Sequence, residues 1–548
     1  MSGPVRLRVG ERARTPRGVA SALGLAVTLL CLATAGGRIT ASDEYTMYRL
    51  TESLVTHGAV WVEAGNAERG PDGRLYPKAA IGQALAAAPF LVVGRVAAAP
   101  FAPVRRDLVT RAVTSLLNPV VLGVLAALLF LLYHALGASP RGAFFWSLAT
   151  CLATPLWVYG KSFLTEPLLA LGLAAGFYGA LRFKATGEPR HAFLAGLAWG
   201  FAILVKYAVA PAVLLLALPF VPQLKRRGAW PAFAAVTACV LVALAYNAAR
   251  TGSPLATGYG RQATAAAFTT PLFVGLYGLL LSSGKGVLWF APLVALVPSA
   301  VGAAVRRLGR PALGILAACA GLTVVYASFE HWAGDGSWGP RYLVPLIPLA
   351  LALVVAAEAQ EPWRGRGRRA LVGGLAAAGL IVQLGGVGIY FGAQMREAGD
   401  YPYTRALDDP SFMVDSHFNP ARTPIAGHWA MLARNAAAHV RGEWPRITPG
   451  GGGPDAAADG AAAGLAPGAV SSVEGSRLAL PPAQVEALTR GLDFWWCYAA
   501  YAGLPRLPLL AAALCLFVAA AFAFARAWRA VRELEVRPLP QAPDVWIA

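Results

Sequence analysis

Two adjacent carboxylates, Asp43 and Glu44, directly follow the first long apolar stretch of this 548-residue sequence. Behind them, apolar residues recur at helical spacing and stop at Gly58, which predicts a helix with Ser42 as its N-cap. Acids in a first helical turn stabilise the helix through its dipole by about 0.3–1 kcal/mol, which is a purely structural role. The same dipole would keep a carboxylate ionised, so that it could accept a proton from a hydroxyl group. The sequence leaves both interpretations open.

Single cations at or inside apolar stretches are the second feature with possible chemistry. A charge near the middle of a bilayer costs roughly 2.5–3.5 kcal/mol on insertion scales, so such residues are rarely without a role. The alternative for each is that its long side chain reaches the membrane surface. If several of them share one face with the two acids, a phosphate or pyrophosphate group is their natural counter-ion. These cations are Lys161, Lys206, Lys285 and Arg341.

Other polar and aromatic residues lie beside these cations. Glu166 follows Lys161 at one helix junction, and Tyr207 follows Lys206 at another. Arg341 ends a loop that is rich in glycine and aromatic residues. The resulting candidates for substrate binding are Glu166, Tyr207, His331, Trp332, Asp335 and Trp338.

The composition shows which kind of element must hold these residues. Apolar residues make up 57% of the chain and charged residues 14%, against about 45–50% and about 25% in soluble domains. This excludes a disordered chain, a coiled coil and a collagen-like repeat. The net charge of +19 could suggest nucleic acid, but Lys and Arg lie in short clusters between apolar stretches. That distribution is typical of a polytopic membrane protein and predicts a lipid bilayer, not nucleic acid, as its environment.

The apolar stretches predict an all-α polytopic membrane protein with about twelve transmembrane helices, since one span needs about 20 mostly apolar residues. Placing the N-terminus in the cytoplasm puts the basic clusters of the short loops on that side, provided that residues 79–103 do not cross. Both termini are then cytoplasmic. Residues 192–222 could also be one long kinked span. The predicted spans are 18–37, 112–137, 143–160, 164–183, 192–204, 206–222, 229–247, 287–305, 311–328, 342–357, 370–391 and 505–527.

The same pattern divides the chain into segments. The first span ends in Ala33-Thr34-Ala35, which resembles a signal-peptide cleavage site, although its apolar stretch is long for one. The six cysteines are scattered, and no zinc or phosphate-loop motif occurs. The predicted segments are a basic cytoplasmic N-terminus (1–17), a transmembrane region (18–391) whose large first extracytoplasmic loop (38–111) carries juxtamembrane helices, an extracytoplasmic segment (392–504) with a Gly/Ala-rich linker (448–468), a last transmembrane helix (505–527) and a cytoplasmic tail (528–548).

Residues 18–391 resemble the GT-C class of polytopic membrane glycosyltransferases, in particular the protein-mannosyltransferase and aminoarabinose-transferase superfamily. The acidic pair follows the first span as it does in that family, and the number and pattern of the later spans also agree. The residues that carry the resemblance are Asp43-Glu44, Tyr76-Pro77-Lys78, and Gly334-Asp335-Gly336-Ser337-Trp338-Gly339-Pro340-Arg341-Tyr342 followed by Pro345 and Pro348.

The resemblance implies transfer of a sugar from a polyprenyl-phosphate-linked donor to an acceptor hydroxyl on the extracytoplasmic face of the cell (inner or plasma) membrane. Asp43 would be the catalytic base, and Glu44 would position the acceptor or assist. The acceptor could be a lipid, a glycan or a protein of the cell envelope. One carboxylate base and a direct displacement would invert the anomeric centre.

The chemistry of such a transfer fits the charged residues. Base assistance to a hydroxyl contributes about 10²–10⁴ in rate, and fixed cations stabilise the charge on a departing phosphate. Trp332 and Trp338 could stack on a sugar, although interfacial tryptophans more often mark the lipid boundary. A divalent cation (Mg²⁺ or Mn²⁺) could bind the acidic pair weakly, but no complete ligand set is evident. By placement and charge, the candidates for binding the donor phosphate are Lys78, Lys161, Lys206, Lys285 and Arg341.

Two other classes of membrane protein share some of these features. A secondary transporter also has about twelve spans and buried charges, but usually shows two similar halves, which this sequence lacks. A flippase or polymerase of lipid-linked glycans is a closer alternative because it handles the same anionic lipid. A membrane scaffold without catalysis would leave the acidic pair and Arg341 unexplained.

Overall fold

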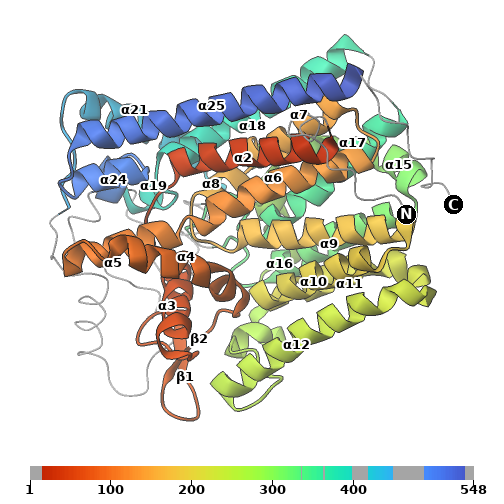
Figure 1. Cartoon of the computed structure of the whole chain (residues 1–548), viewed down its shortest axis with the longest axis horizontal. Coiled ribbons are helices and arrows are strands. Elements are labelled where there is room, and N and C mark those ends of the chain that lie inside the picture. Colours follow the sequence, from red (N-terminus) through yellow and green to blue (C-terminus); the bar gives the residue numbers. More distant parts are fainter. Residues whose placement is uncertain (1–14, 335, 362–364, 398–416, 448–486, 537–548) are drawn as a thin grey trace, which may run out of the picture.

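The computed structural model describes residues 15–334, 336–361, 365–397, 417–447 and 487–536. In this part of the chain, nine helical stretches are long and apolar enough to cross a membrane, and many of the long helices run roughly parallel to one another (Figure 1). The protein is therefore a mostly helical, multi-pass membrane protein. The nine stretches are Pro16–Thr34 (α2), Arg105–Ala135 (most of α5, and α6), Glu166–Thr186 (α9), Tyr207–Lys225 (η1, α11 and η2), Arg227–Thr251 (η3 and α12), Arg310–Ser328 (α16), Arg341–Gln360 (η7 and α17), Arg366–Gly388 (α18) and Arg506–Val536 (α25).

Four of these stretches join several helices, where η denotes a 3-10 helix. Their bounds are α5 Pro103–Thr114, α6 Leu117–Ala135, η1 Tyr207–Val209, α11 Ala210–Ala217, η2 Leu218–Lys225, η3 Arg227–Ala229, α12 Trp230–Thr251, η7 Arg341–Leu346 and α17 Ile347–Gln360.

Three of the twelve predicted spans are shorter or interrupted in the structure. The predicted span 192–204 corresponds to the short apolar helix α10, and the other two are broken next to Pro155 and Pro292. Proline lacks the amide hydrogen that would continue a helix. The count of twelve therefore stays a prediction. The helices concerned are α10 (Pro189–Val205), α7 (Pro140–Leu152) with α8 (Leu156–Gly160), and α14 (Val287–Phe290) with η6 (Pro292–Leu296) and α15 (Val297–Leu308).

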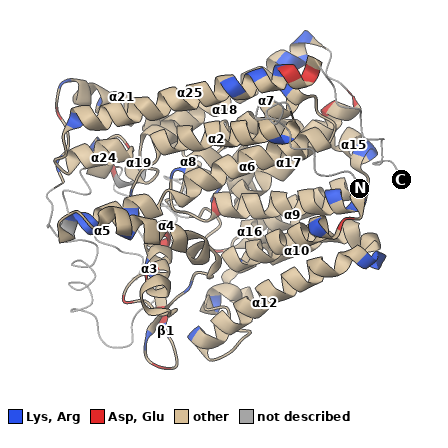
Figure 2. Cartoon of the chain, viewed as in Figure 1, with Lys and Arg blue, Asp and Glu red and all other residues tan. Residues whose placement is uncertain are grey.

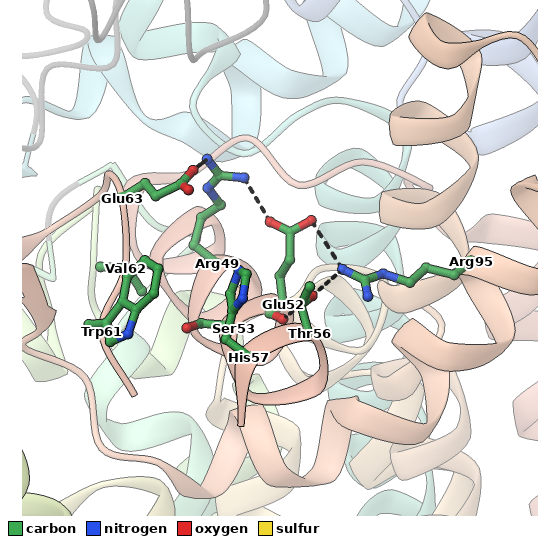
Figure 3. A pocket seen from close by; sticks show the side chains of 9 residues that line it. All are labelled: Arg49, Glu52, Ser53, Thr56, His57, Trp61, Val62, Glu63 and Arg95. Carbon is green, nitrogen blue, oxygen red and sulfur yellow. Dashed lines mark hydrogen bonds and ion pairs between the residues drawn. The ribbon is translucent and has the colours of Figure 1, made fainter. Parts of the chain in front are cut away.

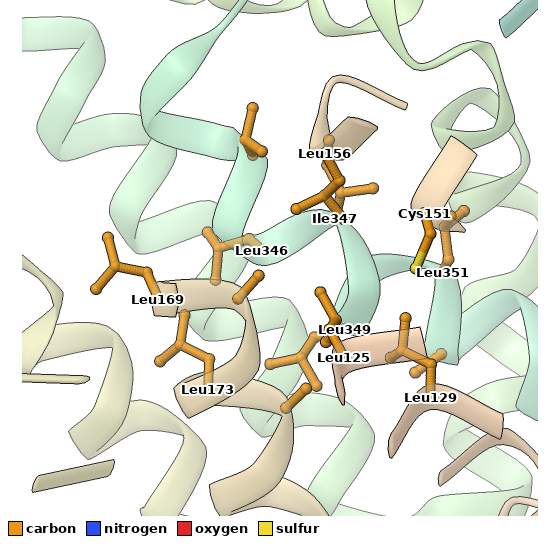
Figure 4. Packing of buried hydrophobic residues seen from close by; sticks show 14 of the residues in the cluster. Leu125, Leu129, Cys151, Leu156, Leu169, Leu173, Leu346, Ile347, Leu349 and Leu351 are labelled. Atoms are coloured by element: carbon orange, nitrogen blue, oxygen red, sulfur yellow. The ribbon is translucent and has the colours of Figure 1, made fainter. Parts of the chain in front are cut away.

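Helix α17 lies at the centre of the bundle. Its residues 347–357 are all buried, which is expected for a helix that is apolar on every side. Leucines of α6 and α9 pack against it, among them Leu125 and Leu173 (Figure 4). Elsewhere, small residues allow close helix contact: a Cβ added at Gly24 of α2 would lie only 2.8 Å from the Gly123 carbonyl oxygen of α6.

The first predicted loop folds into helices and a short ribbon. Helix α3 (Ser42–His57) lies across one end of the bundle, at the lower left of Figure 1, and α4 (Gly82–Ala98) packs against α3 and α5. Between them, β1 (Ala67–Arg69) and β2 (Leu75–Pro77) pair antiparallel. This short ribbon is an addition to the predicted all-α fold class. We call the end of the bundle that carries α3 and the ribbon the loop end.

Several short helices complete the described structure. The last long helix, α25, starts at Arg506 and continues unbroken to Val536, beyond the predicted end of that span at residue 527. The predicted Gly/Ala-rich linker 448–468 lies outside the described residues. The remaining helices are η4 (Gly260–Ala263), η5 (Ala265–Ala267), α13 (Leu272–Leu280), α19 (Ala393–Glu397), η9 (Pro420–Arg422), α21 (Pro424–Val440) and α24 (Trp495–Tyr501).

Basic side chains gather at the end of the bundle opposite the loop end, on the right of Figure 2. We call it the basic end. There Arg141 binds Glu535 near the end of α25, with 2.7 Å between Nε and Oε2. Arg307 Nε donates to the Leu136 carbonyl oxygen at 2.7 Å. These contacts place the start of α7 and the ends of α6, α15 and α25 together.

Candidate functional site

Arg341 brings two acidic residues together at the loop end. Its Nη1 lies 2.9 Å from Asp43 Oδ2, and its Nε lies 2.7 Å from Glu166 Oε1. The planar guanidinium group has donors in fixed directions, so it can bind two carboxylates at once. Residues 43, 166 and 341 thus meet although they are far apart in the sequence.

The two carboxylates differ in their accessibility. The Asp43 side chain is 43% exposed, whereas that of Glu166 is 1% exposed. Both lie at helix starts, Asp43 in the first turn of α3 and Glu166 as the first residue of α9. Only Asp43 is therefore open to a molecule that arrives from outside.

Glu44 is fully buried and holds the start of α3. Its Oε2 accepts hydrogen bonds from the backbone N–H groups of Thr40 and Ala41 at 3.2 and 3.1 Å, and its Oε1 accepts one from Phe163 at 2.8 Å. The N-cap position belongs to Ala41, one residue before the predicted Ser42. These contacts give Glu44 a structural role, and they leave it no access to an acceptor.

Lys206 lies at the turn between α10 and η1, with its Nζ 4.6 Å from the centre of the Tyr342 ring and 5.8 Å from that of Tyr326. Within the described residues, no carboxylate oxygen lies within 4 Å of this Nζ. Burial lowers the pKa of Lys206 to about 8, helped by the charge of Arg341 and opposed by Glu166 and Asp43. Lys206 is thus a cation beside the carboxylates without a direct ion pair, as an anion-binding group would be.

Tyrosines that the sequence analysis did not name as site residues lie around this group. The Tyr326 and Tyr342 rings stack with 4.1 Å between their centres. Burial raises the pKa of Tyr259 to about 12, and the charge of Asp43 adds to this rise. Tyr342 follows Arg341 in the sequence, but nothing there signals Tyr326, which only the fold brings against the Tyr342 ring.

The other predicted phosphate-binding lysines have protein partners. Lys78 Nζ lies 3.2 Å from Glu68 Oε1, and Lys285 Nζ donates to the Ser337 carbonyl oxygen at 2.6 Å. Lys161 Nζ lies 2.9 Å from Asp493 Oδ2, and both side chains are 3% exposed. Each of these lysines already has an oxygen partner in the protein. We therefore do not include them in the site around Arg341.

The predicted aromatic ligands are also explained by packing. Trp332 and Trp338, which were expected as rings that could stack on a sugar, are each 1% exposed. Trp338 Nε1 donates to Gln383 at 3.0 Å, and its ring packs edge-on against Phe290. Trp332 packs against Phe418 with 5.6 Å between ring centres. Both rings are held in the interior, where a ligand cannot reach them.

The remaining candidates lie at different places. His331 Nε2 is 3.7 Å from Glu330 Oε1, and the Tyr207 hydroxyl donates to Asn247 Oδ1 at 3.1 Å. Asp335 lies outside the described residues. The structure thus supports a site of Asp43, Glu166, Lys206 and Arg341.

Arg250 of α12 is a buried cation that the sequence analysis missed. It is 2% exposed, and its Nη1 donates to the carbonyl oxygens of Pro77 and Lys78 at 2.9 and 3.1 Å. The Tyr76-Pro77-Lys78 motif is thereby fixed to α12. Nothing in the local sequence around Arg250 signals this partner, because the contact joins residues about 170 positions apart.

A pocket of 230 Å³ lies on the first loop, between later turns of α3, the loop before β1 and the end of α4 (Figure 3). In it, Arg49 binds Glu52 at 2.7 Å and Glu63 at 3.1 Å, and Arg95 reaches Glu52 at 3.7 Å. Its charged groups neutralise one another, and Asp43 is not among the residues that line it.

The carboxylates do not fit a divalent cation. Among the described residues, no group of three His, Cys, Asp or Glu side chains is arranged to hold a metal ion. Asp43 and Glu166 share Arg341, whose positive charge between them would repel a cation. The reaction proposed below therefore uses only side chains of the protein.

No protein-family model matches the sequence, and a search of curated proteins found no match.

Proposed function

We propose that this protein is a GT-C-like membrane glycosyltransferase that moves a sugar from a polyprenyl-phosphate-linked donor to an acceptor hydroxyl on the extracytoplasmic face. The observation that carries the proposal is the Arg341 guanidinium between the exposed Asp43 and the buried Glu166, with Lys206 beside them. This arrangement combines an accessible base with cations for an anionic leaving group. The resemblance of residues 18–391 to the GT-C class supports the same assignment.

The distribution of charge supports one orientation of the bundle in the membrane. Cytoplasmic loops of membrane proteins are rich in Lys and Arg, so we assign the basic end to the cytoplasm (Figure 2). The loop end then faces the extracytoplasmic side. A lipid-linked donor in the outer leaflet would present its phosphate at that level, where Arg341 and Lys206 lie.

In the resting protein, Arg341 occupies one oxygen of Asp43. A donor phosphate attracts the same guanidinium group, and Lys206 adds a second positive charge. The bound phosphate then weakens the ion pair between Arg341 and Asp43, while Glu166 continues to orient Arg341 through Nε. Donor binding thus prepares Asp43 to accept a proton.

The transfer itself is a direct displacement. The acceptor oxygen forms a bond to the anomeric carbon, and its proton passes to Asp43. The bond between the anomeric carbon and the phosphate oxygen breaks, and the electron pair stays on the phosphate. Arg341 and Lys206 stabilise this developing charge, and attack from the opposite side inverts the anomeric centre.

Purified protein in lipid vesicles should release polyprenyl phosphate from at least one member of a panel of polyprenyl-phosphate sugars. Asp43→Asn should abolish release without changing the thermal unfolding midpoint. Asp72→Asn, at another exposed carboxylate of the first loop, is the matched control and should keep wild-type activity. If the Asp43→Asn variant were active, Asp43 could not be the catalytic base. Movement of intact lipid-linked sugar across the vesicle without release would instead indicate a flippase.

A further inference from the structure

A buried group of two cations and one anion lies beside the proposed site. Asp493 accepts hydrogen bonds from Arg38 Nε at 2.6 Å and Nη2 at 2.8 Å, and its Oδ2 lies 2.9 Å from Lys161 Nζ. The exposed fractions of these side chains are 10% for Arg38 and 3% for the other two. The Tyr498 hydroxyl donates to Asp493 Oδ1 at 3.0 Å. All oxygens of this carboxylate therefore have donors.

The three charged residues come from three separate parts of the chain. Arg38 lies between α2 and α3, Lys161 lies between α8 and α9, and Asp493 lies just before α24. Asp43 follows Arg38 by five positions, and Glu166 follows Lys161 by the same number. Two short segments, 38–43 and 161–166, each end at a carboxylate that binds Arg341. Asp493 binds the first residue of both segments.

Backbone contacts make these two segments a single unit. The Gly36 N–H donates to the Lys161 carbonyl oxygen at 3.3 Å, and the Phe163 N–H donates to Glu44 at 2.8 Å. Lys161 Nζ also donates to the Val387 carbonyl oxygen at the end of α18. A shift of either segment would therefore change the separation of Asp43 and Glu166.

The charges need one another to be stable in the interior. Burial alone would raise the pKa of Asp493, but the charges of Arg38 and Lys161 hold it well below its usual range. Burial lowers the pKa of Lys161 to about 8 against the opposing effect of Asp493. Without the Asp493 charge, Arg38 and Lys161 would repel each other across a small distance.

We propose that Asp493 is a positioning residue: by holding Arg38 and Lys161 together, it fixes the separation of Asp43 and Glu166 at which Arg341 can bind both. Its catalytic consequence rests on the proposed function, whereas its structural consequence does not. The segment before α24 is thereby part of the site's support, although it lies about 450 residues from Arg38 in the sequence.

The test uses the full chain in lipid vesicles and measures both hydrogen exchange and transfer. In Asp493→Asn, amides of segments 36–44 and 161–166 should exchange at least tenfold faster, while amides of α17 and of α9 after Glu166 keep their rates. The kcat of transfer should fall about 100-fold, because a displacement of about 1 Å has effects of that size, and the donor KM should change less than threefold. Asp493→Glu keeps the negative charge, so its exchange rates and its kcat should both stay close to those of the wild type.

Two further variants make the test selective. Glu535→Gln breaks the ion pair of α25 with Arg141 at the basic end, and it should leave both segments and kcat unchanged. Arg38→Gln leaves one buried cation, Lys161, paired with one buried anion, Asp493. This variant therefore tests the positioning role even if Asp493→Asn does not fold. It should speed exchange in segment 36–44 more than in segment 161–166, which stays bound to Asp493 through Lys161.

The outcomes are distinguishable. Uniformly faster exchange in all helices, unchanged exchange in both segments, or an unchanged kcat in Asp493→Asn would each overturn the positioning role. If the wild type transfers no sugar, the proposed function fails, while hydrogen exchange still decides whether Asp493 sets the two segments.

Discussion

Arg341 is the residue on which the proposed site depends most, since one guanidinium group binds carboxylates from α3 and α9. A lysine ammonium is a single point charge and cannot reproduce two donors in fixed directions. We expect Arg341→Lys to lower kcat/KM for transfer more than tenfold. The measurement is the initial rate of polyprenyl phosphate release over a range of donor concentrations.

Arg307→Lys is the control for that substitution, because Arg307 lies at the basic end and donates to a carbonyl oxygen. It should leave transfer unchanged. If the Arg341→Lys variant kept the wild-type kcat/KM, simultaneous binding of Asp43 and Glu166 by one guanidinium group would not be needed for transfer.

Lys206 gives the site a predicted dependence on pH. With its pKa lowered to about 8, the side chain is charged at lower pH and becomes neutral as the pH rises through that value. Attraction for the donor phosphate is thus lost above about pH 8, and the donor KM should rise there. The charged and titratable groups that face Lys206 are Arg341, Glu166, Asp43, Tyr326 and Tyr342.

The variant Lys206→Arg separates this group from the others, because a guanidinium group stays charged throughout the range. Its donor KM should remain flat between about pH 7 and pH 9.5, whereas that of the wild type rises. The same rise in both proteins would assign the titration to another group.

At the scale of elements, the start of α3 separates a structural acid from an accessible one. Glu44 accepts three backbone hydrogen bonds in the interior, whereas the Asp43 side chain is 43% exposed. Glutamine at position 44 keeps one acceptor oxygen and places an NH₂ group against N–H donors. We expect Glu44→Gln to lower the free energy of unfolding by about 1–3 kcal/mol.

Thermal and denaturant unfolding of the purified variants measures this difference. Asp43→Asn, the adjacent substitution, should change stability by less than about 0.5 kcal/mol because its side chain is partly solvated. Equal stability of the Glu44→Gln variant and the wild type would contradict the capping role.

At the scale of the whole molecule, the orientation of the bundle in the membrane is testable. Arg69 on the ribbon and Arg227 at the basic end are both exposed. In a chain with Cys515→Ser, Arg69→Cys should react with an impermeant thiol reagent added to intact cells. Arg227→Cys should react only after the membrane is opened. The reverse pattern would place Asp43 in the cytoplasm and exclude the proposed reaction on the outer face.

The sequence alone determined the class of protein and the main elements. Apolar stretches of about 20 residues and basic clusters between them are local properties, so hydropathy and charge predict spans without knowledge of the fold. Asp43 and Arg341 were recognisable for the same reason, since a charge next to an apolar stretch stands out from its neighbours. Breaks such as that at Pro155 were harder to predict, because buried neighbours decide how much helix remains around a proline.

Only the tertiary structure decided which charges meet. Lys161 and Lys206 look alike in the sequence, yet Lys161 binds Asp493 while Lys206 lies beside Arg341 and Tyr342. Trp338 was expected as a substrate-binding ring, and the structure places it in the interior. The physical reason is that an ion pair or a packing contact depends on the distance between segments hundreds of residues apart, and no local pattern encodes that distance.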